Sequence, residues 1–166
     1  FISTNTSLKW PVPFTRNISS GWGTRWGTFH YGIDISATNI YLKPVVAMAD
    51  GIIYKATNDC KHKSIKPSCS CGSGFGNHVR INHGTMTLKI KDKNLKNAQK
   101  QTVKLGAIYG HMDHIIVSEG QHVKQGQVLG YVGTTGSSTG YHLHLSILIN
   151  GTGTHADAIN PLRVLF

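Results

Sequence analysis

The run Tyr141-His142-Leu143-His144-Leu145 predicts a β-strand, because polar and apolar side chains alternate along it. Successive side chains of a strand point to opposite faces, so His142 and His144 would share one face while Leu143 and Leu145 pack into a core. The run therefore predicts two imidazoles at one place on a sheet. A strand that simply exposes two histidines is the alternative, since the chain has 10 histidines in 166 residues.

The composition around this run is that of a turn-rich β protein. Glycine is abundant, with 19 residues, and only 14% of the residues are charged, where about 25% is usual. The length suits one domain with its own core. The sequence contains no run of about 18 apolar residues, so it does not predict a membrane-spanning segment. The formal charge of +10 favours a polyanionic partner, such as nucleic acid, an anionic membrane or an acidic cell wall, without choosing among them.

Short β segments dominate the order of the chain. Residues 1–12 are expected to form an extended lead-in, and a start at Phe1 suggests a processed product or a piece of a longer protein. Asp50-Gly51, between two apolar segments, is a hairpin signal. The lysine-rich block 86–104 predicts a protruding hairpin with a charged tip, and no convincing amphipathic helix is found.

Five residues have the chemistry of a hydrolytic zinc site. Catalytic zinc takes three nitrogen or oxygen ligands from the protein and keeps a fourth position open, and His30, Asp34 and His144 supply such a set. Gly32 and its β-branched neighbours place His30 and Asp34 at a strand end rather than on a helix. His111 and His142 remain: one can draw a proton from the attacking water, and both can steady the oxyanion.

His78 and His83 have opposite parity on their predicted strand, so they cannot both face one site. We therefore expect both to be structural or on the surface.

Several motifs together resemble the lysostaphin-type (LytM-like) zinc endopeptidases, a family of peptidoglycan hydrolases. The resemblance covers roughly residues 21 to 163. The matching motifs, in the family's order, are Gly-x-Arg at 23–25, His-x-x-x-Asp-Ile at 30–35, Val-Ala-x-x-Asp-Gly at 46–51, Gly-Phe-Gly-Asn at 74–77, Tyr-Gly-His-Met at 109–112, Gly-x-x-Val-Lys-x-Gly-Gln-x-x-Gly at 120–130, Gly-x-Ser-Thr-Gly at 136–140 and His-x-His at 142–144.

This resemblance implies a mainly β fold, like a duplicated hybrid motif, with an antiparallel sheet as its core and long loops that wall a substrate groove. It implies that one zinc ion is bound by His30, Asp34 and His144, and that His111 and His142 are catalytic. We also expect Arg25, Trp26 and Tyr109 to line the groove. Some relatives have lost ligands and only activate other hydrolases, but all five positions are filled here.

The resemblance also sets the biological expectations. Residues 1–166 would form a single catalytic domain that cleaves peptide bonds in peptidoglycan stem peptides or cross-bridges, with no nucleic-acid partner. The domain would be monomeric within a longer chain or assembly. Its location would be extracellular or in the cell envelope, or on a virion as part of a phage tail. Whether Gly-Gly bridges or links to D-amino acids are cut is left open.

Departures from the family pattern affect substrate preference rather than the metal site. Residues 57–76 and 86–104 look like insertions, Tyr141 stands where many relatives have proline, and Leu145-Ser146 replaces an aromatic-acid pair. In the first insertion, Cys60, His62, Cys69 and Cys71 could bind a second, structural zinc ion. One disulfide with a spare thiol, or three reduced thiols, is the expectation that we favour.

Two other classes of protein are alternatives. A phosphocarrier or biotinyl-type β-module would share the hairpin pattern near Val123-Lys124 but would not need His30 and Asp34. A noncatalytic basic module that binds cell wall or nucleic acid would bind equally well after chelation and would cleave nothing.

Overall fold

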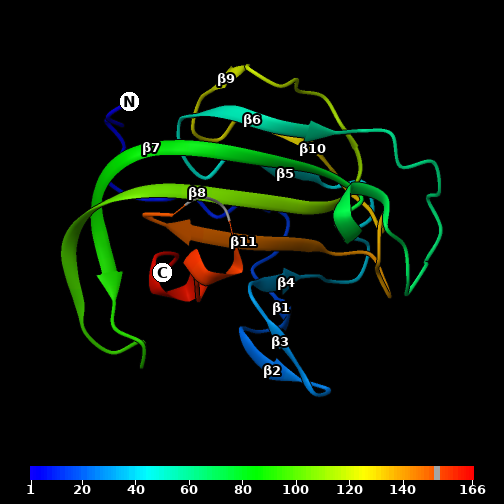
Figure 1. Cartoon of the computed structure of the whole chain (residues 1–166), viewed down its shortest axis with the longest axis horizontal. Helices are drawn as coiled ribbons and strands as arrows, with labels where there is room; N and C mark the ends of the chain where they lie inside the picture. Colours follow the sequence, from blue (N-terminus) through cyan, green and yellow to red (C-terminus); the bar gives the residue numbers. More distant parts are fainter. Residues whose placement is uncertain (152–153) are drawn as a thin grey trace.

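The computed structural model describes residues 1–151 and 154–166. Over these residues the chain is built from strands and short turns and forms no α-helix (Figure 1). The strands are β1 (Ile18–Ser20), β2 (Gly23–Arg25), β3 (Thr28–His30), β4 (Ile33–Ile35), β5 (Pro44–Val46), β6 (Gly51–Thr57), β7 (Asn77–Lys91), β8 (Ala98–Ile115), β9 (His122–Val123), β10 (Val128–Val132), β11 (Leu143–Ile149) and β12 (Ala158–Ile159). Short 3₁₀ segments cover Cys71–Gly74, His155–Asp157 and Pro161–Arg163. No helix among the described residues is long and apolar enough to cross a membrane.

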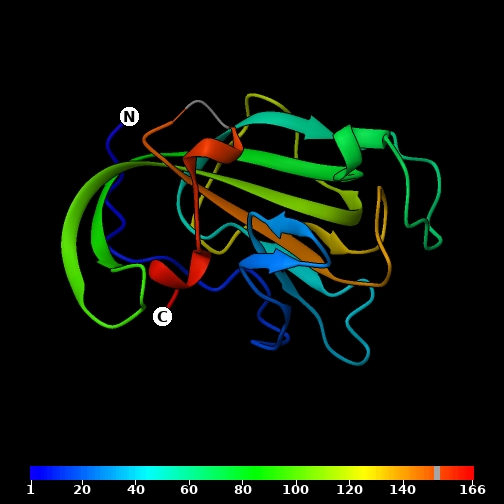
Figure 2. The same ribbon diagram turned by 60° about the horizontal axis from the view of Figure 1, so that its bottom comes forward.

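Ten of the strands form one antiparallel sheet in the described part of the chain. Its main order is β1-β4-β11-β8-β7-β6-β9, while β10 pairs with β5 and β8, and β12 pairs with β11. β2 and β3 make a separate two-stranded hairpin that lies in front of the sheet in Figure 2. The predicted fold class, mainly β with an antiparallel core, is confirmed.

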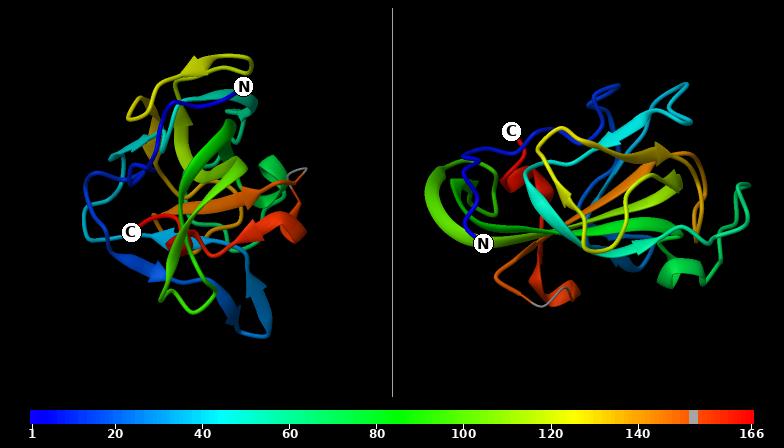
Figure 3. Two further views of the ribbon diagram at one scale, coloured as in Figure 1. Left: turned by 90° about the vertical axis from the view of Figure 1, so that its left-hand side faces the viewer. Right: turned by 90° about the horizontal axis from the view of Figure 1, so that it is seen from above.

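β7 and β8 form a long hairpin that curls at its far end, as Figures 1 and 3 show. Their pairing runs from Asn77 opposite Met112 out to Lys91 opposite Ala98. At the tip, the Asp92 carboxylate accepts backbone N–H groups of the turn. The predicted charged hairpin at 86–104 is therefore present. That this hairpin is an insertion relative to the family stays a prediction.

β11 lies in the middle of the sheet, between β4 and β8. Leu143 and Leu145 are fully buried in the core beside Ile33 and Ile35 of β4, so the alternation predicted for this run is confirmed. The strand begins at Leu143, two residues later than predicted. His142 lies just before it, joined to Gly133 by an isolated bridge.

The hairpin predicted at Asp50-Gly51 is wrong. β5 pairs with β10, and β6 pairs with β7 and β9, so the two segments that flank this turn do not pair with each other. The Asp50 carboxylate accepts the backbone N–H of Gln125, and the Asp50 N–H donates to Asn5. These hydrogen bonds to distant segments hold the turn in place. The prediction failed because the alternation of side chains within a strand does not specify which other strand it will pair with.

Candidate active site

The centre of the site lies where β3, β4 and β11 meet. His144 on β11 is directly opposite Asp34 on β4. His30 is the last residue of β3, and two residues separate it from the start of β4. The turn between β3 and β4 needs glycine at position 32. A Cβ there would lie 2.4 Å from the Leu145 carbonyl oxygen and 2.9 Å from the His144 imidazole. The sequence predicted one strand end for His30 and Asp34; the structure divides them between two strands that still bring them together.

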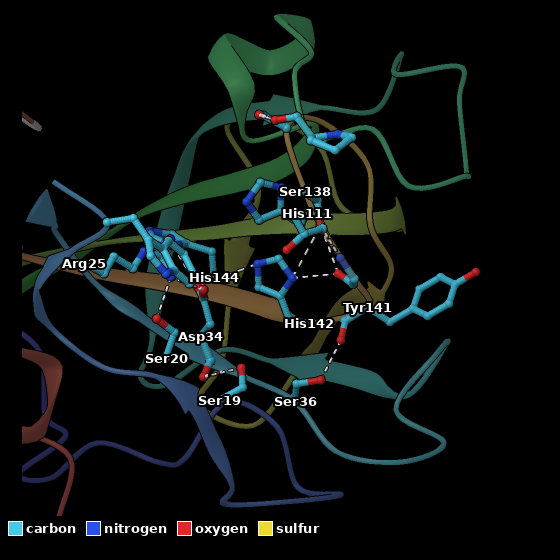
Figure 4. Close-up of a pocket in the computed structure, with 15 residues that line it drawn as sticks. Ser19, Ser20, Arg25, Asp34, Ser36, His111, Ser138, Tyr141, His142 and His144 are labelled. Carbon is cyan, nitrogen blue, oxygen red and sulfur yellow. Dashed lines mark hydrogen bonds and ion pairs between the residues drawn. The ribbon is translucent and has the colours of Figure 1, made fainter. Parts of the chain in front are cut away.

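His30, Asp34 and His144 are buried and close enough to hold one metal ion. The Nε2 atom of His30 and the Nδ1 atom of His144 each lie 3.2 Å from Oδ1 of Asp34, and 3.2 Å from one another. Figure 4 shows Asp34 and His144 among the residues that line a groove. The ligand set predicted from the sequence is thus assembled in space.

Hydrogen bonds fix which ring nitrogen of each ligand histidine faces this centre. The Nδ1–H of His30 donates to the Gly21 carbonyl oxygen at 2.9 Å. The Nε2–H of His144 donates to Ser146 Oγ at 2.7 Å, and this hydroxyl donates in turn to the Tyr31 carbonyl oxygen at 2.9 Å. The remaining nitrogen of each ring therefore directs its lone pair at Asp34. Two neutral imidazoles oriented by outer hydrogen bonds, with one carboxylate, fit a zinc ion.

Asp34 is a carboxylate in this setting. Burial alone would raise its pKa, but His144 and His30, when protonated on the nitrogens that face the carboxylate, outweigh burial and hold the pKa of Asp34 well below its usual range. A bound metal ion would take the place of these protons. Its second oxygen, Oδ2, accepts a hydrogen bond from the Arg25 guanidinium at 3.0 Å. One carboxylate oxygen is thus left for a metal ion while Arg25 occupies the other.

His111 and His142 lie beside this centre with their rings 4.8 Å apart. The Nδ1–H of His111 donates to the Thr135 carbonyl oxygen, and that of His142 to the Gly140 carbonyl oxygen, both at 2.7 Å. In each ring this leaves Nε2 as the nitrogen with a lone pair; Nε2 of His142 is 3.6 Å from Oδ1 of Asp34. These two imidazoles can accept protons next to the metal centre.

Burial lowers the pKa of His111 to about 3, helped by the nearby His142 and His144. His111 is therefore neutral at ordinary pH and carries no proton on Nε2. Its backbone has a φ of 60°, an uncommon conformation for a residue other than glycine. The bond from its N–H to the Phe75 carbonyl oxygen, at 2.7 Å, holds it there.

The groove above the centre has a volume of about 430 Å³. Arg25 and Trp26 line it, as expected from the sequence. The expectation for Tyr109 is wrong: its side chain is fully buried in the core, where its hydroxyl accepts the Met48 N–H and contacts His83. The motif shared with the family located this position along the chain but not the face on which its side chain lies.

Other groove residues were missed by the sequence analysis. The serine-rich turn before β11 contributes Ser137 and Ser138, and Ser138 Oγ is 3.4 Å from Nδ1 of His142. Pro67, from the segment 57–76, lies on the same wall, and Tyr141 lies at the groove with its ring 4.5 Å from that of Tyr41. A turn rich in glycine and serine directly before the His-x-His motif was the available signal.

The remaining histidines of interest are structural, as predicted. His78 and His83 are both buried, at 1% and 0% exposure, and neither lines the groove. Among the cysteines, Cys60 and Cys71 form a disulfide and Cys69 is a free thiol, which is one of the two arrangements favoured above.

Known proteins share parts of the sequence and the fold of this chain. Residues 97–158 match the sequence pattern of Peptidase family M23. The chain is 34% identical over 163 residues to the DD-carboxypeptidase/endopeptidase Mpg of Neisseria meningitidis serogroup B, covering 93% of this chain and 28% of that protein. It is 29% identical to the murein hydrolase activator NlpD of Salmonella dublin, covering 98% of this chain and 34% of that protein. The chain thus spans about a third or less of the length of these relatives.

A solved structure shows the same fold. The catalytic domain of lysostaphin from Staphylococcus simulans superimposes with a TM-score of 0.60 at 25% identity, covering 88% of this chain and 89% of that domain. The antiparallel β fold of this chain is thus the fold of that peptidase domain. The chain belongs to peptidase family M23.

Proposed function

We propose that this chain is the catalytic domain of a zinc-dependent endopeptidase that hydrolyses peptide bonds of peptidoglycan on the outer side of the cytoplasmic membrane. The observation that carries the proposal is the direction of the ring nitrogens. The lone pairs of His30 and His144 point at Asp34. In His111 and His142 a carbonyl oxygen accepts the Nδ1–H group, so the lone pair of each ring is on Nε2.

His30, Asp34 and His144 would hold the zinc ion, which supplies a Lewis acid that polarises the scissile carbonyl and acidifies a water molecule. The protein residues then handle protons. The Nδ1–H bond of His111 leaves a lone pair at Nε2, where the ring can take a proton from the attacking water; His142 presents the same nitrogen to the groove. An imidazole that has taken a proton becomes a donor, which can steady the oxyanion or protonate the leaving amine.

The groove and the charge of the chain fit a peptide substrate in an acidic wall. Arg25 and the exposed Trp26 line the groove, where they can contact a bound peptide, and the net charge of +10 favours approach to an anionic polymer. The relatives are much longer than this chain, so we infer that the domain acts as part of a larger protein.

The murein hydrolase activator among the relatives raises the alternative of a noncatalytic domain that binds the wall. The presence of all five side chains, each oriented by its own hydrogen bond or ion pair, favours catalysis. A binding domain would have no use for two further imidazoles whose Nε2 atoms carry lone pairs beside Asp34.

Digestion of purified peptidoglycan from several wall types tests the proposal. We expect new amine ends, identified by mass, which disappear with a chelator and return when zinc is added. His142→Ala should release none, while His122→Ala, which removes an exposed histidine outside the groove, should cleave normally. Failure of every wall type, or cleavage that a chelator does not affect, would contradict the proposal.

A further inference from the structure

A second cluster of metal-ligating side chains lies in the segment 57–76, apart from the groove centre. It consists of Cys60, His62, Cys69 and Cys71, whose ligand atoms all lie within 4.8 Å of one another. We propose that these four residues form a second zinc site, of Cys3His composition, that is filled when the three cysteines are thiols and is closed when Cys60 and Cys71 are joined as a disulfide.

The disulfide accounts for only two of the four groups. Cys69 Sγ lies 3.3 Å from Cys71 Sγ, and His62 Nε2 lies 3.2 Å from Cys69 Sγ and 3.8 Å from Cys71 Sγ. In a tetrahedral zinc site with Zn–S bonds of about 2.3 Å, the ligand atoms are about 3.5–3.8 Å apart. The non-bonded separations here are already close to the edges of such a tetrahedron.

The hydrogen bonding of His62 suits a ligand. Its Nδ1–H donates to the Ser64 carbonyl oxygen at 2.9 Å, so the lone pair is on Nε2, the atom that faces the sulfurs. Neutral imidazole with an outer carbonyl partner is the usual state of a zinc-bound histidine. Gly136 N–H also approaches this Nε2, at 3.3 Å, a long contact that metal binding would replace.

Charge and anchoring favour the same conclusion. Three thiolates, one imidazole and Zn²⁺ carry a net charge of −1, and the segment offers three lysines, Lys61, Lys63 and Lys66, against the single acid Asp59. Cys60 is fixed to the sheet, because its N–H donates to Asn77 on β7 at 2.9 Å. One ligand therefore belongs to the rigid core and the other three to the loop that would fold around the ion.

The Cys60–Cys71 disulfide must be reduced before the four residues can bind zinc. A dithiol reductant supplies two electrons and two protons to the Cys60–Cys71 disulfide and becomes a disulfide itself. The three cysteine thiols then release their protons as they bind Zn²⁺. Either state ties the loop down, and zinc would tie all four residues rather than two.

The site would hold one wall of the groove. The backbone carbonyls of Lys66 and Pro67, inside the loop, accept hydrogen bonds from the Ser138 N–H and the Ser137 hydroxyl. Pro67 and these serines line the groove next to His142. The second zinc would thus be structural, and it would set the position of the wall against which the substrate lies.

Metal titration of the whole chain tests this inference without using activity. The protein carries His144→Ala, which removes a ligand from the groove centre, and is reduced with a dithiol and desalted without oxygen. We expect it to bind one Co²⁺ per chain with a thiolate-to-cobalt charge-transfer band and the visible bands of a tetrahedral ion, and Zn²⁺ should displace the cobalt. A reduced protein without the charge-transfer band would overturn the proposal.

Variants in the same background identify the ligands. His62→Ala and Cys69→Ser both leave the Cys60–Cys71 pair intact, so each can be purified folded in the oxidised form and then reduced. Each should weaken zinc binding by more than the roughly 10–100-fold that loss of an outer hydrogen bond costs. Ser70→Ala, an exposed neighbour, should bind like its parent. Equal affinity in Cys69→Ser and Ser70→Ala would overturn the assignment of Cys69.

Discussion

Ser146→Ala should weaken zinc binding at the groove although Ser146 is not a ligand. The serine hydroxyl accepts the Nε2–H of His144 at 2.7 Å and donates to the Tyr31 carbonyl oxygen at 2.9 Å. Alanine removes the acceptor, so a buried N–H loses its partner and the imidazole is free to turn or to change tautomer. Loss of such an outer partner typically costs 10–100-fold in metal affinity, or about 1.4–2.8 kcal/mol.

Competition with a chromophoric zinc chelator measures this loss in protein kept oxidised, so that the cysteines do not bind metal. Ser118→Ala, which changes an exposed serine away from the groove, is the matched control and should bind like wild type. Thermal unfolding of the metal-free proteins separates a binding defect from a folding defect. If Ser146→Ala binds zinc as tightly as Ser118→Ala, the hydrogen-bond chain to Tyr31 does not orient His144.

Three further predictions concern the buried histidine, the turn and the groove. Burial lowers the pKa of His83 to about 4 from 6.5, so the unfolded chain binds the extra proton and stability should fall by up to about 3 kcal/mol as the pH drops from 6.5 to 4. Denaturant titrations at several pH values check this, and a His83→Asn variant with the same slope as wild type would contradict it. Gly32→Ala places a Cβ 2.9 Å from the His144 imidazole, so it should reduce zinc affinity at least about tenfold. Gly106→Ala, whose Cβ would have its nearest contact at 3.7 Å, should not, and equal affinities would count against the tight turn. Trp26→Ala removes an 89% exposed ring at the groove and should weaken sedimentation with peptidoglycan while leaving the melting temperature unchanged; undiminished binding would exclude Trp26 from substrate contact.

The β11 strand shows what sequence alone could predict. Alternation identified the buried face of Leu143 and Leu145 and the polar face of His144, because side-chain direction in a strand depends only on position along the chain. The metal-ligand candidates also followed from residue type, since few side chains bind zinc.

The pairing of the strands and the burial of individual side chains could not be predicted in the same way. Asp50-Gly51 has the sequence of a hairpin turn, but its flanking strands pair elsewhere, because partner choice depends on contacts far away in the chain. Tyr109 stands beside the Gly-His motif and still points into the core, where His83 and the Met48 N–H meet its hydroxyl. The segment 57–76, which departs from the family pattern, gave no signal of how it packs, and it supplies Pro67 to the groove.

His30, Asp34 and His144 are assigned as metal ligands, and His111 and His142 as proton carriers. One paired measurement tests this division most directly. Zinc content and release of amine ends from peptidoglycan are measured on oxidised His144→Ala and His142→Ala proteins. We expect His144→Ala to lose both zinc and cleavage, and His142→Ala to keep about one zinc per chain while releasing no amines. Loss of zinc from both variants, or cleavage by a His142→Ala protein, would contradict the division.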